Sequence, residues 1–234
     1  MTRKPGAFVP FLAAAAALLA AAAPAATLHV TVTGADGQPA ADTVVLVQPA
    51  AGAQGGVAPA PTTVAIEQRD FRFWPYIAVV APGGAVPFVN KDPYDHHIRT
   101  LPGGPLGNVA PVKTFEYRLA ASGRNGDTSE RVLLDLPGSI LLGCHLHGSM
   151  RGHVLVASSP WFAVTDERGR ARVDGLPEGA VEMKLWHPDQ LGEQAPQKLT
   201  LGPSLGTEAR LNFTPRKRPP PRADPSYGPP GAKD

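Results

Sequence analysis

The side chains best suited to chemistry in this 234-residue sequence lie together in one short stretch. From Cys144 to His153 the sequence reads CHLHGSMRGH, with the only cysteine of the chain, three of its seven histidines and one of its three methionines. A thiolate is a soft metal ligand, and neutral imidazole suits copper and zinc. His147 follows Cys144 by three positions and Met150 follows by three more, so one loop can present three ligands to a single metal ion.

One short loop cannot surround an ion, so a further ligand must come from another part of the chain. The stretch NKDPYDHHI, roughly fifty residues upstream, contains His96 and His97. Successive side chains of a strand point to opposite faces, so only one of the two can face the ion if they lie in a strand. Two histidines, one cysteine and a distant methionine are the ligand set of a blue-copper electron-transfer centre. The residues therefore predict a site for one copper ion.

Other kinds of site fit the sequence poorly. A thiol nucleophile with a histidine base needs a group that orients the base, and three positions on a tight loop give poor geometry for such a dyad. No glycine-rich loop follows a strand and opens a helix, as a phosphate-binding site requires. A structural zinc site usually brings more cysteines, and seven histidines are too few for a multicopper oxidase. We therefore expect a protein that is not an enzyme.

The elements that must position these ligands are short strands. The chain has 25 glycines and 27 prolines, and only 6% of its residues are aromatic, which is typical of strands joined by turns. Alternating or β-branched runs around turn residues predict paired strands, and no long amphipathic helix is evident. These runs lie in Leu28–Pro49, Ile77–Asn90, Ser129–Leu146 and Phe162–Pro188. We expect an all-β fold.

Two stretches carry a resemblance to a known family. Cys144 to Gly152 resembles the copper loop of amicyanin-like cupredoxins, with Cys-x-x-His-x-x-Met followed by Arg-Gly and an apolar strand. PFVNKDPYDHHI resembles the plastocyanin-like segment in which Phe-x-Asn precedes the first histidine ligand. The resemblance covers Thr63 to Ala157 and implies a cupredoxin Greek-key sandwich that binds one copper ion. In that family the ligand follows the asparagine by six positions, which implies His96 when counted from Asn90.

The resemblance thus implies a ligand set of His96, Cys144, His147 and Met150. Amicyanin-like loops usually carry proline and an aromatic residue where this chain has Gly148-Ser149, so a looser loop is expected. Three further histidines stand near the proposed ligands: His97, His145 and His153. We expect His97 and His145 either to be exposed or to contact the ligands, and His153 to lie on the surface. Asp92 and Asp95 are interpreted as solvated turn residues.

A second module is indicated on both sides of the copper segment. VTVTGADGQPAADTVVLVQP resembles the first strands of carboxypeptidase-regulatory or prealbumin-like modules, and Phe162–Pro188 resembles their remaining strands. More broadly, the chain resembles the secreted methylamine-utilisation-type, plastocyanin-like proteins, in which a cupredoxin segment is followed by a module that matches Phe162–Pro188 here. The chain would enter this small β-sandwich, leave to build the copper domain, and return, which is cheap when the termini of the insert lie close together. The alternative is that Leu28–Pro49 forms edge strands of the cupredoxin.

The predicted boundaries follow from these patterns. The regulatory-like module takes residues 26–50 and 158–213, and the cupredoxin domain takes residues 63–157. The small, flexible stretch 51–62 is interpreted as a linker. The proline-rich, charged tail 214–234 cannot bury enough apolar surface to order itself, so we expect it to be disordered.

The N-terminus has the pattern of a secretory signal. Arg3 and Lys4 precede an apolar run from Ala7 to Ala23, and Ala23-Pro24-Ala25 offers small residues to signal peptidase. The run is rich in alanine and only marginally long enough to cross a bilayer, so a retained membrane anchor is the alternative. We expect residues 1–25 to be removed, no membrane span thereafter, and a periplasmic or secreted protein.

Charge and cysteine content narrow the function further. A formal net charge of +2 gives no strong field for nucleic acid. A single cysteine cannot form an intramolecular disulfide, which leaves a free buried thiol, half of an intermolecular bridge, or a metal ligand.

We therefore expect a periplasmic type 1 copper protein that carries single electrons between redox partners, such as a dehydrogenase or a cytochrome. The weak sulfur of Met150 would favour Cu(I), and His147 on an exposed loop would be the electron exit. The alternative is a copper-binding or copper-delivery module without electron transfer, in which His145 and His153 accept metal from a partner. A plain adhesion module with incidental histidines is the third hypothesis.

Overall fold

The computed structural model describes residues 25–53, 55–60, 62–122 and 129–218. These residues form strands and turns without any helix, which confirms the predicted all-β fold. It follows that the described part of the chain has no helix long and apolar enough to cross a membrane. The expected signal peptide, apart from its last residue, lies outside the described residues.

Sixteen strands are present in the described residues, at most eight residues long. Their bounds are β1 Ala26–Thr33, β2 Val44–Pro49, β3 Ile66–Arg69, β4 Arg72–Trp74, β5 Ile77–Val80, β6 Gly84–Asn90, β7 His96–Leu101, β8 Glu116–Leu119, β9 Ser129–Leu134, β10 Gly138–Cys144, β11 Arg151–Val156, β12 Trp161–Val164, β13 Arg170–Leu176, β14 Gly179–Trp186, β15 Gln197–Leu201 and β16 Ser204–Arg210. The strands expected within Leu28–Pro49, Ile77–Asn90, Ser129–Leu146 and Phe162–Pro188 are therefore present.

The first sandwich contains β3 to β11. One sheet has the strand order β5-β11-β10-β7-β8, and the other has the order β4-β3-β6-β9. The inward side chains of both sheets form one apolar core, which includes Phe88, Ile98, Ile140, Leu142 and Val154. Alternation accounts for this core, because residues two apart on a strand share a face.

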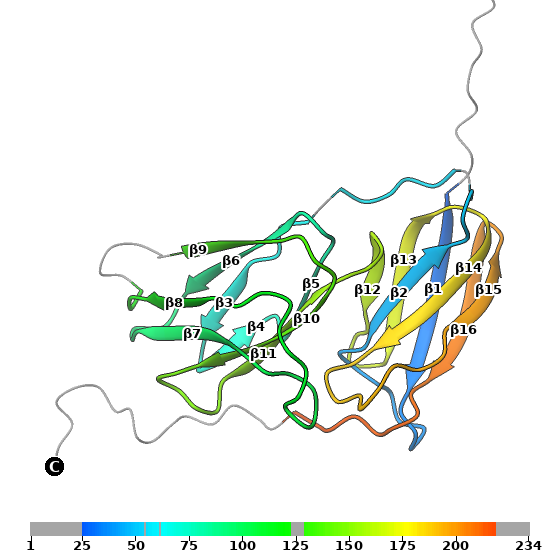
Figure 1. Ribbon diagram of the computed structural model, residues 1–234. Coiled ribbons are helices and arrows are strands. Elements are labelled where there is room, and N and C mark those ends of the chain that lie inside the picture. The colour runs from blue at the N-terminus through cyan, green and yellow to red at the C-terminus, as the bar shows by residue number, and fades with distance from the viewer. Residues whose placement is uncertain (1–24, 54, 61, 123–128, 219–234) are drawn as a thin grey trace, which may run out of the picture.

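The second sandwich is formed by the two ends of the chain. One sheet has the order β13-β1-β16 and the other has the order β12-β2-β14-β15. β1 pairs antiparallel with β13 and parallel with β16, whereas β2 lies between β12 and β14. In the described residues, neither β1 nor β2 pairs with a strand of the first sandwich. The chain therefore enters the second sandwich, leaves after β2, builds the first sandwich and returns at β12 (Figure 1).

The two sandwiches pack on each other through a separate apolar cluster. One side of it comes from β5, β11 and the residue after β11, and the other side comes from β2, β12 and β14. Its members include Ile77, Val79, Leu155, Ala157, Val44, Leu46, Phe162 and Trp186. On β11 these contact residues alternate with Val154 and Val156, which face the core of the first sandwich. The sheet edge formed by β5 and β11 is therefore covered on both faces.

The chain segment after β16 also contacts both sandwiches. It runs from the second sandwich toward the first, orange to red in Figure 1. The guanidinium of Arg216 donates to Asp189 at 2.6 Å, and that of Arg218 lies 2.8 Å from Asp42 and 4.6 Å from the ring centre of Tyr76. Residues 214–218 of the expected tail thus lie along both sandwiches, and residues 219–234 lie outside the described residues.

Candidate metal centre

Pairing of β7 with β10 brings the predicted ligands together. The two strands are antiparallel, and Cys144 at the end of β10 lies opposite Ile98, two residues after the start of β7. Alternation along β7 turns His96 and Ile98 inward, where both are fully buried. His97 points outward, and its Nε2 lies 2.9 Å from Glu116 Oε1. The structure therefore places His96, rather than its neighbour, beside the cysteine.

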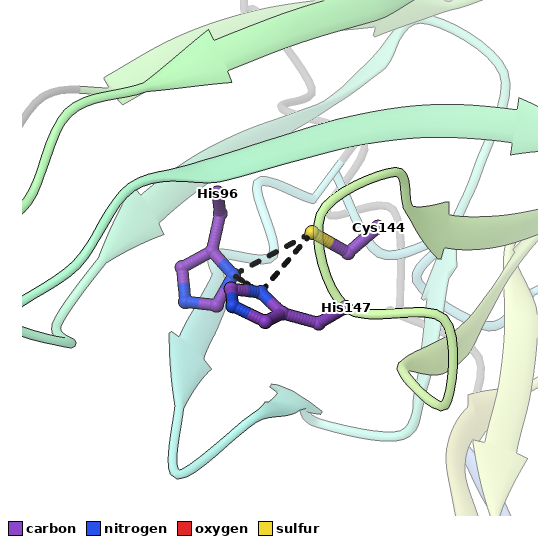
Figure 2. A group of neighbouring side chains, drawn as sticks. All are labelled: His96, Cys144 and His147. Atoms are coloured by element: carbon purple, nitrogen blue, oxygen red, sulfur yellow. Dashed lines mark hydrogen bonds between the residues drawn. The ribbon is translucent and has the colours of Figure 1, made fainter. Parts of the chain in front are cut away.

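His96, Cys144 and His147 form one compact group in which every side chain offers an atom to the same point (Figure 2). Cys144 Sγ lies 3.7 Å from His96 Nδ1 and 3.5 Å from His147 Nδ1, and the two nitrogens are 3.2 Å apart. Their exposed fractions are 0% for His96, 3% for Cys144 and 1% for His147. In the described part of the chain, no other group of three His, Cys, Asp or Glu side chains converges in this way.

The loop between β10 and β11 is held by its own backbone and by one arginine. The Met150 backbone N–H donates to the His147 carbonyl at 3.0 Å. Arg151 Nη1 donates to the carbonyls of Gly148 and Met150 at 2.8 and 2.7 Å. Met150 is buried in the same core cluster as Cys144, and its ligation of a metal stays a prediction.

The Arg-Gly pair after the loop has a packing role. Arg151 fixes the loop, and the glycine that follows lets the two sheets approach. A side chain at Gly152 would place its Cβ 2.8 Å from the Cβ of Phe73 on β4. The turn between β3 and β4 can therefore lie close to the candidate site.

Asp92 is a component of the site that the sequence interpretation placed wrongly in solvent. It is only 3% exposed, and its Oδ2 lies 2.8 Å from His96 Nε2. Its carboxylate also accepts the backbone N–H groups of Asp70 at 2.8 Å and Phe71 at 3.4 Å. The Asp92 N–H donates to Asn90 Oδ1 at 2.9 Å, so the asparagine of the Phe-x-Asn segment fixes the turn. Its position four residues before His96 was the only signal that could have found it.

Two aromatic rings cover His147. The Phe71 ring contacts it edge-on, with ring centres 4.9 Å apart, and stacks on Tyr94 at 4.6 Å. Tyr94 also contacts His147 at 5.7 Å. The sequence predicted an exposed loop with His147 as the electron exit. Gly148 and Ser149 of that loop are exposed, but His147 itself is buried because the β3–β4 turn and the 91–95 loop close over it, and its role as electron exit stays a prediction. No spacing in the sequence indicates this cover, since its two rings are 23 positions apart.

Hydrogen bonds within the group oppose the effect of burial on its charges. Burial alone raises the pKa of the Cys144 thiol, but hydrogen bonds from His96 and from the backbone N–H groups of His97 and His147 outweigh it and lower that pKa. Burial alone lowers the pKa of His96, and its bonds to Asp92 and Cys144 reverse the effect and raise it. The surroundings thus favour the thiolate that a soft metal ion requires.

The remaining histidines near the loop lie outside the group. His97 is 30% exposed beside Glu116, and His145 is exposed. His153 was predicted on the surface, and this is wrong because it lies half-buried between the sandwiches, with Tyr76 Oη 3.3 Å from its Nε2. Asp95, also interpreted as solvated, is partly exposed and pairs with Arg118 at 2.9 Å.

The residues present fit a soft or borderline metal ion. A thiolate and two neutral imidazoles suit copper or zinc, whereas magnesium and calcium prefer oxygen ligands. Two imidazoles and a single thiolate, with a buried thioether on the same loop, differ from the cysteine-rich set of structural zinc sites. The donor set is therefore the one predicted for a copper ion.

Comparison with known proteins gives partial structural matches. No family model matches the chain. No curated protein sequence matches it either. Part of the chain is similar to a Cu-containing nitrite reductase from Thermus scotoductus SA-01, with 21% identity, a TM-score of 0.34, and coverage of 47% of this chain and 25% of that chain. The chain thus spans a quarter of the length of that protein.

Two smaller solved proteins are similar to a comparable part of the chain. An amicyanin from Paracoccus versutus has 18% identity and a TM-score of 0.32, with coverage of 43% of this chain and 94% of that chain. A pseudoazurin from Sinorhizobium has 22% identity and a TM-score of 0.31, with coverage of 42% of this chain and 76% of that chain.

Proposed function

We propose that this protein is a periplasmic type 1 copper protein that carries single electrons between redox partners. The observation that carries the proposal is the convergence of His96 Nδ1, Cys144 Sγ and His147 Nδ1 within 4.8 Å of one another in a buried position. Two imidazoles and a thiolate, with a methionine on the same loop, are the donor set of a blue-copper centre. Copper held there would supply a one-electron couple.

The protein residues supply rigidity and exclude water. Cys144 lies at the end of a strand paired on both sides, and His96 opens the strand beside it. The His97 backbone N–H donates to Cys144 Sγ at 3.4 Å, which fixes the sulfur and moderates its charge. Ligands held in one geometry change little between two charge states, so a transferred electron requires little rearrangement of the protein.

The surroundings of Cys144 favour electron transfer over catalysis. A cavity of about 360 Å³ lies beside the loop and is lined by Trp74, Met150 and Arg151 among others. Cys144 is not part of its lining, so this cavity brings no substrate to the thiol. The thiol is therefore placed to donate to a metal and is poorly placed to attack a molecule from solvent.

The alternative is a copper-delivery module without electron transfer. Delivery requires that the metal leave to a partner, and the rings of Phe71 and Tyr94 close the side of His147. His145 is exposed, but His153 lies half-buried at the contact between the sandwiches. The burial of all three converging ligands therefore favours electron carriage, with a dehydrogenase or a cytochrome as the expected class of partner.

Copper loading of the purified mature chain tests the proposal. We expect one Cu(II) ion per chain, a strong visible band from sulfur-to-copper charge transfer, and reversible one-electron reduction in a potentiometric titration. Cys144→Ser should abolish the band because the hydroxyl is a poor donor, while the far-ultraviolet circular dichroism stays that of a β protein.

The controls separate the candidate functions. Ser149→Ala changes an exposed hydroxyl on the same loop and should leave the band in place. A band that survives Cys144→Ser would falsify the proposed site. Tight binding of Cu(I) without a visible Cu(II) band would instead support the delivery module, and absence of any copper binding would contradict both.

A further inference from the structure

We propose that Asp92 is a positioning residue of the metal centre. Its carboxylate fixes the ring of His96, and it also fixes the turn that covers His147. The proposal rests on the metal-binding function proposed above and adds to it a residue that the ligand pattern does not include.

The first contact determines which nitrogen of His96 faces the metal. Asp92 Oδ2 lies 2.8 Å from His96 Nε2, and an ionised carboxylate can only accept a hydrogen bond. A ring that binds a metal is neutral, so its single hydrogen sits on Nε2 and its lone pair lies on Nδ1. Only the metal-free, protonated ring can also donate from Nδ1 to Cys144. Nδ1 is the atom directed at Cys144, as Figure 2 shows. A metal-binding histidine that donates its other nitrogen to a carboxylate is a stronger and better oriented ligand.

The second contact holds the turn between β3 and β4. Asp70 and Phe71 have φ angles of 54° and 57°, in the left-handed region that residues with a side chain rarely adopt. A two-residue hairpin of this kind usually contains Asn-Gly or Asp-Gly, and a phenylalanine at its second position is strained. Both backbone N–H groups of the turn donate to the carboxylate of Asp92. The turn is therefore held in this conformation by the residue that also holds His96.

The two contacts together connect both histidine ligands to one carboxylate. Held in this way, the turn places the ring of Phe71 against His147. The burial of Asp92 makes these contacts strong, because no water competes for its oxygens.

Asp92→Asn is the variant that tests the proposal. The amide keeps the shape of the side chain and one acceptor oxygen, so the turn can remain bonded, but the negative charge toward His96 is lost. We expect Cu(II) affinity, measured by competition with a chelator, to fall about 10–100-fold. We also expect the reduction potential to rise, because a nearby negative charge favours the more positive oxidation state of the ion.

Asp95→Asn is the matched control. Asp95 lies in the same loop and also carries a negative charge, but it pairs with Arg118 and accepts the backbone N–H of Ala121. Removing its charge should leave both the affinity and the potential close to those of the wild-type protein. Equal effects of the two variants would overturn the proposal, because charge removal anywhere in the loop would then suffice.

Three further outcomes complete the test. Unchanged affinity and potential in Asp92→Asn would reduce Asp92 to a structural residue and overturn the proposal, while leaving the copper function intact. Wild-type protein that binds neither Cu(II) nor Co(II) would overturn both. If the variant does not fold, nuclear magnetic resonance of the Cu(I)-loaded wild-type protein decides. A proton on His96 Nε2 supports the proposal, and a proton on Nδ1 rejects it.

Discussion

Two buried regions of this protein contain histidine, and they use it in opposite ways. At the candidate metal centre, His96 is fully buried beside a thiol and a carboxylate. At the contact between the sandwiches, His153 is half-buried against the aromatic rings of Tyr76 and Trp186. Both residues lie in the same sheet, on strands that flank β10. The difference between them therefore comes from their neighbours and not from their position in the fold.

The charges of the two histidines show what this difference means. At the metal centre the bonds to Asp92 and Cys144 outweigh burial and raise the pKa of His96. At the contact between the sandwiches burial is not outweighed, and it lowers the pKa of His153 to about 4. Burial by itself thus gives a neutral packing residue. A buried metal site of this kind also requires polar partners. Burying those polar groups lowers the stability of the protein unless each one forms a hydrogen bond.

The largest expected effect breaks the metal centre alone. We predict that His96→Gly empties or reshapes the copper site, so that the visible band is lost, because one of two imidazoles and the partner of Asp92 are removed together. Imidazole added to the solution should restore the band by occupying the space of the lost ring. Absorption spectra of the Cu(II)-loaded variant, recorded with and without imidazole, measure both effects.

A comparable loss at the contact between the sandwiches should affect stability and leave the copper band in place. Leu155 points into the cluster between the sandwiches, while its neighbours on β11 face the core of the first. We predict that Leu155→Ala lowers the free energy of unfolding by about 2–5 kcal/mol. Denaturant titration measures the loss, and Leu191→Ala, at a leucine that is 78% exposed, is the control with little effect. A lost band in Leu155→Ala would mean that the two regions are coupled.

The sequence predicted the fold well because alternation and turns are local signals. The runs in Leu28–Pro49 and Phe162–Pro188 alternate, and the structure has two and three strands there. Their partners were harder to assign, because pairing of β1 with β16 joins segments about 175 residues apart. Only the resemblance to a split module suggested that the two ends of the chain meet. The alternative, edge strands of the first sandwich, could not be rejected from periodicity.

The candidate site was predicted only as far as spacing carries information. Cys144 and His147 follow from their spacing, whereas His96 was implied by the resemblance to the plastocyanin-like segment, counted from Asn90. The burial of His147 and the role of Asp92 depend on the β3–β4 turn, which reaches them through contacts with no regular period. Charged residues in turns are usually solvated, so Asp92 was interpreted by that general tendency. Its burial required a structure.

The next prediction concerns how the free energy of unfolding depends on pH through His153 at the contact between the sandwiches. His153 has a folded pKa of about 4 against an ordinary value of 6.5, with Asp189 and His187 as the other charges that act on it. Below the ordinary value the unfolded chain binds a proton that the folded chain does not, so the folded state loses stability as the pH falls from 6.5 toward 4. We predict a loss of about 2 kcal/mol from this residue between ~pH 7 and ~pH 4.5.

The variant His153→Gln isolates this contribution. Glutamine does not titrate, so the difference in unfolding free energy between the variant and the wild-type protein should itself change with pH. Both proteins are measured without metal. His96 titrates in the opposite sense, but it is present in both proteins, so its contribution cancels in the difference. A pH-independent difference would show that the proton on His153 is not excluded at the contact between the sandwiches.

The smallest expected effect lies one residue from the largest. His97 points away from the site, is 30% exposed, and pairs with Glu116, which is 55% exposed, so the pair contributes less than about 1 kcal/mol. Its link to the site is the backbone N–H that donates to Cys144 Sγ, and glycine keeps that group. We therefore predict that His97→Gly retains the visible band, shifts the potential only slightly, and lowers Cu(II) affinity less than about tenfold, below the loss for a carboxylate partner of a ligand. Spectra and chelator competition, measured beside His96→Gly, give the comparison. If His97→Gly loses the band and His96→Gly keeps it, then His97 and not His96 is the ligand. The assignment of side chains to the inward face of β7 would then be wrong by one residue.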